Sequence, residues 1–337
     1  MRPTIAAPAL ALATAASLAV TLPAAAQDCA QGMRAFEHAA GTACIPVAPQ
    51  RIVSVRGEQF TAPLWELGAP LVGSAGRTDD GKNGGAPYPR GAFDLFNLTF
   101  DGSDLTWIGS PNDPDFESIV ALEPDLILIP DWQEDLLEQF ELIAPTVAIG
   151  IHSNPMLERY RLIADAAGLL DRYEAGLQRY QSRLTAARLV VADRLGDPAD
   201  VSVVIAEVFN DNGGLTVYGN YGAMSQVLAD LGFAEPQIAT DLGVANESVS
   251  VELLPEIQAD FMIGTYNLAF DQPPSQRIEE WERLFPAWDE VLHAARHNQH
   301  LLIDREPMRA LSFRALEEVL AIFLSHIATR DFVPLEG

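Results

Sequence analysis

The chain has 337 residues, with 21 Lys and Arg against 47 Asp and Glu, a formal net charge of −26, and two cysteines. So acidic a composition argues against binding to nucleic acid or an anionic membrane, because those partners need a basic face. A hydrophobic fraction of 48% argues against a disordered tail and can supply the cores of one large or two medium-sized lobes. Lys82 is the only lysine, so the cationic chemistry of the chain depends on its arginines.

The first 26 residues have the pattern of an export signal. Arg2 gives a positive start, an Ala-, Leu- and Val-rich stretch covers residues 5–22, and small residues precede the expected cut after Ala26. Lipoprotein processing needs a small residue just before the acylated cysteine, whereas Asp28 stands there. We therefore expect a soluble periplasmic product, residues 27–337, without a lipid anchor.

The two cysteines, Cys29 and Cys44, would then meet an oxidising compartment. A disulfide between them would close a loop of about 15 residues, worth on the order of 3 kcal/mol. A metal or redox pair is disfavoured because the spacing is not Cys-x-x-Cys. We expect a structural disulfide.

The first half of the chain alternates short apolar strands with helices. Strands are predicted at 51–55, 71–73, 125–130 and 146–149, with helices at 59–67, 116–122 and 136–143. Such alternation is typical of an α/β fold with a parallel sheet. Residues 76–104 form a long Gly-, Asp- and Pro-rich loop, a feature that is usually functional in a compact domain.

A helical pattern over residues 155–194 separates this half from a second one. Gly168 ends its first piece, and the second piece, 171–194, would be a helix about 35 Å long. The second half then has strands at 201–205, 260–264 and 301–304, a loop at 209–221 and a helix at 223–231. Segments 115–129 and 250–263 share one pattern, a Glu, a short helix and an Asp-led strand. We expect an N-terminal lobe over 27–154, connecting helices over 155–194 and a C-terminal lobe over 195–337.

Several segments together resemble the periplasmic substrate-binding proteins of ABC importers for iron–siderophores, haem and cobalamin. The opening His-Ala-Ala-Gly-Thr of residues 38–42 is most similar to the ferric-citrate and ferric-siderophore branch. The other matching segments are 49–53, 66–73, 117–127 and Tyr218-Gly219. The resemblance runs through the whole mature chain.

The resemblance implies two α/β lobes with mainly parallel sheets, joined by one long helix, with the ligand in the cleft between them. It also implies one exposed glutamate per lobe that docks into an arginine pocket of the permease, here Glu117 and Glu252. The alternative is that both are ordinary first-turn acids, which the helix dipole favours.

Ligands of open α/β sheets bind beyond the carboxyl ends of the strands. The residues at and near those ends are mainly arginines and aromatics, a set that suits a large anion such as a ferric chelate. The alternative is that most of these arginines are solvated or salt-bridged surface groups. The candidate ligand-binding residues are Arg56, Arg77, Arg90, Trp132, Tyr218, Tyr221, Tyr266, Arg305 and Arg309.

We therefore expect a monomeric binding protein that captures a ferric siderophore and delivers it to an inner-membrane ABC permease. It would need no resident metal or cofactor and no nucleic-acid partner. The chain has no Gly-x-Ser-x-Gly, P-loop, Gly-x-Gly-x-x-Gly or His-Glu-x-x-His motif, so an enzyme is disfavoured.

Two alternatives remain for the ligand. Haem or cobalamin could bind the same fold, and haem would need an axial ligand such as Tyr218, Tyr221 or Tyr266. A free metal at His293, His297 and His300 is disfavoured, because the helix carrying the first of these is expected to end near His297.

Overall fold

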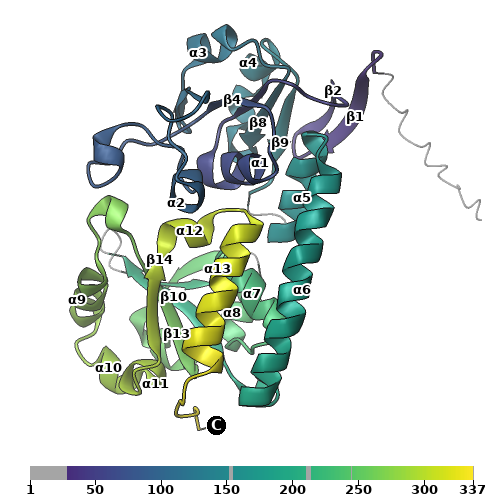
Figure 1. The fold of residues 1–337 in the computed structure, drawn as a ribbon. Helices are drawn as coiled ribbons and strands as arrows, with labels where there is room; N and C mark the ends of the chain where they lie inside the picture. The colour runs from purple at the N-terminus through teal and green to yellow at the C-terminus, as the bar shows by residue number, and fades with distance from the viewer. Residues whose placement is uncertain (1–28, 152–154, 210–213, 244, 337) are drawn as a thin grey trace, which may run out of the picture.

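The computed structural model describes residues 29–151, 155–209, 214–243 and 245–336. Two lobes, each built on a five-stranded sheet, lie one above the other in Figure 1, and helix α6 (Leu170–Leu195) runs along one side. The predicted fold of two α/β lobes joined by one long helix is confirmed. The export signal with its cut after Ala26, and the lobe boundary after residue 154, lie outside the described residues.

The N-terminal sheet is wholly parallel, in the order β5-β4-β3-β8-β9. Its strand β8, which lies between β3 and β9, is apolar throughout because both of its faces are buried: Leu126 and Leu128 pack on one side, Ile127 and Ile129 on the other. The strands are β3 (Ile52–Ser54), β4 (Leu71–Ser74), β5 (Thr106–Trp107), β8 (Leu126–Pro130) and β9 (Thr146–Ile149).

Helices cover both faces of this sheet. A short helical turn over Gly57–Thr61 leads into α1 (Ala62–Glu66), and these pack with α5 (Met156–Ala166) on one face. Helices α3 (Phe116–Ala121) and α4 (Leu137–Glu141) pack on the other. The long loop between β4 and β5 contains the short helix α2 (Ala92–Phe96), and the small hairpin of β6 (Gly109–Ser110) and β7 (Asp113–Pro114) follows β5.

The C-terminal sheet has the order β12-β11-β10-β13-β14 and is only partly parallel. Strands β10 (Val203–Phe209), β13 (Phe261–Tyr266) and β14 (His300–Asp304) pair in parallel. Strand β11 (Gly214–Tyr218) pairs antiparallel with both of its neighbours, β10 and β12 (Asn246–Val249). The prediction of a loop over 209–221 was therefore wrong, since β11 occupies part of it. Alternate residues of β11, Leu215 and Val217, are fully buried in a core that includes Trp281.

Seven helices and four short helical turns follow α6 in this second lobe among the described residues. Helices α7 and α13 share a core with α6, while α8 to α11 and the turn over Val251–Ile257 contribute to the core on the opposite face. The helices are α7 (Ala223–Leu231), α8 (Gln237–Leu242), α9 (Pro274–Leu284), α10 (Trp288–Val291), α11 (His293–Arg296), α12 (Arg305–Arg309) and α13 (Phe313–Phe323).

The two lobes share one hydrophobic core along α5, α6 and α13. The rings of Tyr160, Tyr173 and Phe313, one from each of these helices, have centroids 4.8–5.4 Å apart. The Glu66 carboxylate, at the end of α1, accepts hydrogen bonds from the backbone amides of Phe313 (2.8 Å) and Arg314 (2.9 Å), and so caps α13 of the other lobe. A continuous core resists wide separation of the lobes.

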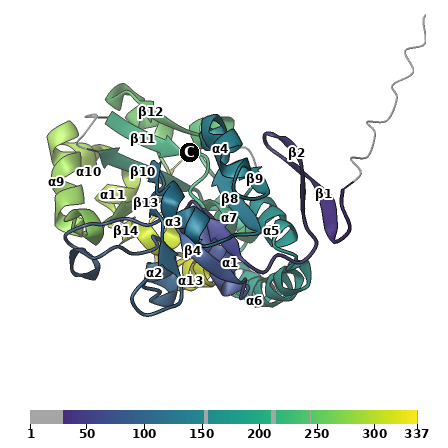
Figure 2. The same ribbon diagram turned by 90° about the horizontal axis from the view of Figure 1, so that it is seen from above.

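An N-terminal hairpin, β1 (Met33–His38) and β2 (Gly41–Pro46), has no counterpart among the predicted elements and stands at the side of the molecule in Figure 2. The Cys29–Cys44 disulfide is present as predicted and joins the start of the described chain to β2. Arg34 pairs with Asp165 of α5 at 2.9 Å, which holds the hairpin to the body of the protein. Among the helices described, none combines the length and the apolar character that crossing a bilayer would require.

Candidate functional site

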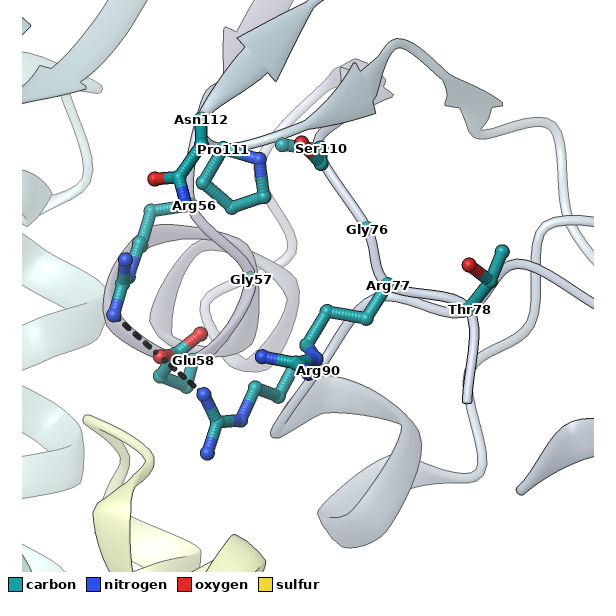
Figure 3. Close-up of a pocket in the computed structure, with 11 residues that line it drawn as sticks. Arg56, Gly57, Glu58, Gly76, Arg77, Thr78, Arg90, Ser110, Pro111 and Asn112 are labelled. Atoms are coloured by element: carbon teal, nitrogen blue, oxygen red, sulfur yellow. Dashed lines mark hydrogen bonds and ion pairs between the residues drawn. The ribbon is translucent and has the colours of Figure 1, made fainter. Parts of the chain in front are cut away.

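Two hollows lie where the carboxyl ends of the strands meet the other lobe. The first is formed by the N-terminal lobe alone, from the segments that follow β3 and β4, from the tip of the β6–β7 hairpin and from Arg90 (Figure 3). The second is formed by both lobes, from the short turn after β3, from α5, and from the segments around β11 and α12. Together they contain Arg56, Arg77, Arg90, Tyr218, Tyr221, Arg305 and Arg309 of the predicted site.

Each arginine of the first hollow has a carboxylate partner. Arg56 pairs with Glu58 at 2.9 Å, and Arg77 makes two bonds of 3.1 Å to the Asp79 carboxylate. Figure 3 shows Glu58 between the guanidinium groups of Arg56 and Arg90. Burial alone would raise the pKa of Glu58, but Arg56 and Arg90, with Arg309 beyond them, lower it, so the carboxylate stays ionised. The charge of this hollow is therefore largely compensated from within the protein.

Arg90 also links the lobes. Its Nε and Nη2 donate to the two carboxylate oxygens of Glu306 at 2.6 and 2.8 Å, and Asn267 Nδ2 donates to the same carboxylate at 2.7 Å. Both ionic side chains are buried, Arg90 to 9% and Glu306 to 2% exposure. Burial would raise the pKa of Glu306, but the hydrogen bonds and charge of Arg90 lower it to about 2. We name this group, Arg90, Glu306 and Asn267, the interlobe bridge.

The second hollow contains three arginines and no carboxylate. Arg159 comes from α5 in the middle of the chain, while Arg305 and Arg309 begin and end α12. The other groups that line it are neutral amides, tyrosines and backbone. The lining residues are Gln59, Ile151, Arg159, Tyr218, Asn220, Tyr221, Gly222, Asn246, Arg305 and Arg309.

Two of these guanidinium groups have donors to spare. In the part of the chain that the structure describes, Arg309 makes no hydrogen bond and no ion pair, and burial together with nearby Arg305 lowers its pKa. Arg159 donates through Nη1 to the Ile151 carbonyl, but its buried Nε has no partner among the described residues. Burial lowers the pKa of Arg159 to about 10. Both groups remain cationic at neutral pH, so the hollow is suited to an anion.

Tyr218 and Tyr221 present rings to the second hollow while their hydroxyl groups bond within the C-terminal lobe. The Tyr218 hydroxyl donates to the buried carboxylate of Glu207 at 3.0 Å, and that of Tyr221 shares a 3.1 Å hydrogen bond with Thr265. The two rings meet edge to face, with centroids 4.6 Å apart. Burial and the charge of Glu207 raise the pKa of both phenols, so neither readily becomes a tyrosinate ligand.

Trp132 and Tyr266, the other two predicted residues, line neither hollow as described. Trp132 lies in the turn after β8, is 45% exposed, and its ring stands 5.7 Å from the guanidinium carbon of Arg56. Trp132 is thus next to the first hollow. Tyr266 pairs with Asp304 across the ends of β13 and β14, and burial and this carboxylate raise its pKa.

The histidines considered for a free metal do not converge. Helix α11 ends before His297, as predicted; His293 Nε2 bonds to the Val333 carbonyl at 2.8 Å. His300 lies in the core against Trp288, where burial lowers its pKa to about 4. Across the described residues, no cluster of three or more His, Cys, Asp or Glu could hold a metal ion.

Glu117 and Glu252 occupy equivalent positions in the two lobes. Each is exposed and is the second residue of a helical turn, after an Asp115 or Ser250 cap whose side chain accepts its backbone N–H. Each turn leads to the strand that pairs in parallel with the first strand of its sheet, β8 or β13. This symmetry agrees with the repeat seen in the sequence, and the docking role itself stays a prediction.

Six residues of the second hollow were not predicted. Ile151 and Gly222 are two of them, and the four with polar side chains are Gln59, Arg159, Asn220 and Asn246. A sequence signal existed for Arg159, because it lies on the same helical face as Met156, Tyr160 and Ile163, all buried. An arginine within an apolar helical stripe needs a partner or a cavity. The three amides follow no comparable pattern.

Comparisons with known proteins agree with this architecture. The profile of the periplasmic binding protein family matches residues 85–306. The iron(3+)-hydroxamate-binding protein FhuD of Bacillus subtilis (strain 168) is 26% identical over 243 residues, 69% of this chain and 70% of its own. The probable siderophore-binding lipoprotein YfiY of the same strain is 25% identical over 256 residues, 74% of this chain and 72% of its own.

Solved structures show the same fold. Staphylococcus aureus SirA, complexed with staphyloferrin B, superposes with a TM-score of 0.68 at 20% identity, covering 86% of this chain and 97% of SirA. The FhuD protein from S. pseudintermedius superposes with a TM-score of 0.67 at 21% identity, covering 90% of this chain and 99% of its own. The family profile spans more than half of the 337 residues, and the chain belongs to the periplasmic binding protein family.

Proposed function

We propose that this protein captures a ferric siderophore in the periplasm and delivers it to the permease of an ABC importer in the inner membrane. The observation that carries the proposal is the second hollow, where three arginines and no carboxylate meet between the lobes of a chain with a net charge of −26. The names of the relatives FhuD and YfiY, an iron(3+)-hydroxamate-binding and a probable siderophore-binding protein, support iron chelates as the ligand class.

The cargo is an intact chelate rather than bare iron. Fe³⁺ needs oxygen ligands with negative charge, and the second hollow offers guanidinium and amide groups instead. Guanidinium groups bind the oxygen atoms of an anionic chelate from outside. The protein thus works as a binder without a resident metal, cofactor or catalytic step.

Haem is the weaker alternative. An axial phenolate would have to come from Tyr218 or Tyr221, whose hydroxyl groups are engaged with Glu207 and Thr265 and whose pKa values are raised by burial. Tyr266 lines neither hollow. Nothing in the geometry favours cobalamin over an anionic chelate.

The mature protein is proposed to be soluble and monomeric. Although YfiY is named as a lipoprotein, Asp28 precedes Cys29 here, and the Cys29 thiol is consumed in the disulfide with Cys44. Mass spectrometry of the exported chain should show a start at Gln27 and no lipid. Light scattering should give the mass of one chain.

Titration of residues 27–337 by tryptophan fluorescence tests the proposed function. The panel contains ferric citrate, ferric hydroxamate and catecholate chelates, their metal-free forms, haem and cobalamin, with free tryptophan as the control for absorption by the chelates. Saturable quenching by a ferric chelate, weaker for its metal-free form, is expected. A response to haem or cobalamin alone would overturn the ligand, and no response to any probe would overturn the function.

Docking through Glu117 and Glu252 is a separate prediction. Changing both to alanine should leave chelate affinity unchanged, because both are exposed and line neither hollow, and should abolish uptake in cells. The matched control is Glu138→Ala with Glu256→Ala, two exposed acids from the same regions. Normal uptake with the first pair would refute docking.

A further inference from the structure

The chemistry of the second hollow is more specific than a general affinity for siderophores. Its lining contains three guanidinium groups, neutral amides and two tyrosines, and no carboxylate. In the first hollow, by contrast, carboxylates pair with all three arginines. In a chain with 47 acidic and 21 basic residues, a site with arginines and no acid is far from the average composition.

This arrangement costs stability when the hollow is empty. Burial, together with repulsion from the guanidinium group of Arg305, lowers the pKa of Arg309, and the charge of Glu58 offsets this only in part. Arg309 makes no ion pair among the described residues, and a bound anion would supply one. Features that destabilise a fold without a compensating contact are typical of functional sites.

Siderophore chelates differ in the charge that they present. Three hydroxamates, each carrying one negative charge, neutralise Fe³⁺ and leave an uncharged complex. Citrate-type α-hydroxycarboxylate ligands leave a net negative complex and can present free carboxylates. Guanidinium forks pair with such carboxylates through two parallel hydrogen bonds, a contact that an uncharged hydroxamate complex cannot match.

We propose that the second hollow selects anionic, carboxylate-bearing ferric chelates over uncharged hydroxamate chelates, with Arg159, Arg305 and Arg309 as the specificity-determining residues. This inference rests on the proposed function and narrows its ligand class. It separates this chain from its relative FhuD, which is named for iron(3+)-hydroxamate. Arg309, which makes no hydrogen bond among the described residues, has the most donors available to a carboxylate.

The test uses the mature chain and three probes: ferric citrate, ferrichrome as the uncharged hydroxamate, and an iron(III) tris-catecholate, which is anionic but has no carboxylate. Ferric citrate should bind at least about tenfold more tightly than ferrichrome, since charge-assisted hydrogen bonds are the stronger class. The tris-catecholate should bind more weakly than ferric citrate. Equal binding of the two anions would overturn carboxylate selection.

Arg309→Gln should lower the affinity for ferric citrate by about tenfold or more and change that for ferrichrome less than about twofold. The matched control is Arg183→Gln, on the exposed side of α6. Arg309→Met should unfold at the same denaturant concentration as the unchanged chain or a higher one, because it removes a buried charge that has no ion pair among the described residues.

The outcomes distinguish a failure of the proposed carboxylate selection from a failure of the proposed function. Binding of no ferric chelate at all would refute the proposed function. Tight ferrichrome binding that Arg309→Gln does not alter, with ferric citrate weaker, would leave that function standing and refute the carboxylate selection. If Arg309→Gln lowered the affinity for ferrichrome as much as that for ferric citrate, the carboxylate selection would also be refuted.

Discussion

The two hollows have similar numbers of arginines but opposite charge balance. In the first, Glu58, Asp79 and Glu306 pair with the arginines. In the second, no carboxylate lines the surface beside Arg159, Arg305 and Arg309. The position of an arginine near a cleft is therefore a poor indicator of ligand contact by itself. A better indicator is whether a carboxylate of the protein already pairs with that arginine.

The comparison also separates two tasks. The paired arginines join parts of the protein, and Arg90 does so across the lobes through the interlobe bridge. The backbone N–H of Leu311, in the C-terminal lobe, donates to the carbonyl of Glu58, in the N-terminal lobe, at 2.9 Å. This bond and the interlobe bridge both join the two lobes. In the second hollow, Arg309 makes no hydrogen bond among the described residues and the buried Nε of Arg159 has no partner there, so these two groups are suited to an incoming anion.

The largest expected effect comes from removing one member of the interlobe bridge. Arg90→Met leaves the Glu306 carboxylate buried with only Asn267 as a direct partner, which should cost about 3–5 kcal/mol of unfolding free energy. Arg90→Met with Glu306→Met removes both charges and should recover most of this loss. Urea unfolding of the unchanged chain, the Arg90→Met variant and the double variant measures these differences. If Arg90→Met were as stable as the unchanged chain, the bridge would not stabilise the fold.

Acid should weaken the same bridge. Glu306 has a pKa of about 2 in the folded protein, below its ordinary 4.5. Its contribution is thus fully present above about pH 4.5 and is lost as the pH falls from there toward 2. Half-buried Glu66, whose pKa is raised by desolvation, acts in the opposite direction. The difference between the unchanged chain and Glu306→Gln in urea midpoint should therefore shrink across this window, and a constant difference would contradict the assignment.

Most of the fold followed from the sequence, because apolar runs and glycine stops are local signals. The long helix was expected at 171–194 and is found at Leu170–Leu195, and β9 and α7 have the predicted bounds. Strand β11 was missed because it is short and lies among glycines, a pattern that also describes a loop. Its strand character comes from pairing with β10 and β12, which is a tertiary effect.

The candidate site was harder to predict, for a physical reason. The strand-end rule found arginines of both hollows, yet it could not tell that Arg56, Arg77 and Arg90 are paired with carboxylates whereas Arg309 makes no ion pair among the described residues. Arg90 and Glu306 are separated by 216 positions in the chain, and no local pattern relates them. Arg159 was overlooked because its helix was interpreted as a connector only.

A moderate effect is expected from giving the second hollow a carboxylate. Asn220→Asp keeps the oxygen that accepts the Gly222 backbone N–H at 3.1 Å and adds one negative charge to the lining. The affinity for ferric citrate should fall by about tenfold, because the new anion competes for the arginines, while the empty protein keeps or gains stability. Gln178→Glu on exposed α6 is the control for net charge. If Asn220→Asp bound ferric citrate as tightly as the unchanged chain, the absence of a carboxylate from the lining would not matter for binding.

The smallest effect should come from Arg77, and it is the most direct test of the comparison. Arg77 is 35% exposed at its side chain, pairs with Asp79, and lies 4.7 Å from the ring of Phe270 in the other lobe. Because the pair is open to solvent on the Arg77 side, we expect it to contribute about 1 kcal/mol or less, and Asp79 keeps the Tyr88 hydroxyl as a donor when Arg77 is removed. Arg77→Met should therefore change stability by about 1 kcal/mol and ferric citrate affinity by less than about twofold. A tenfold loss of affinity would mean that ligand displaces Asp79 from Arg77, and the distinction between paired and available arginines would no longer locate the binding site.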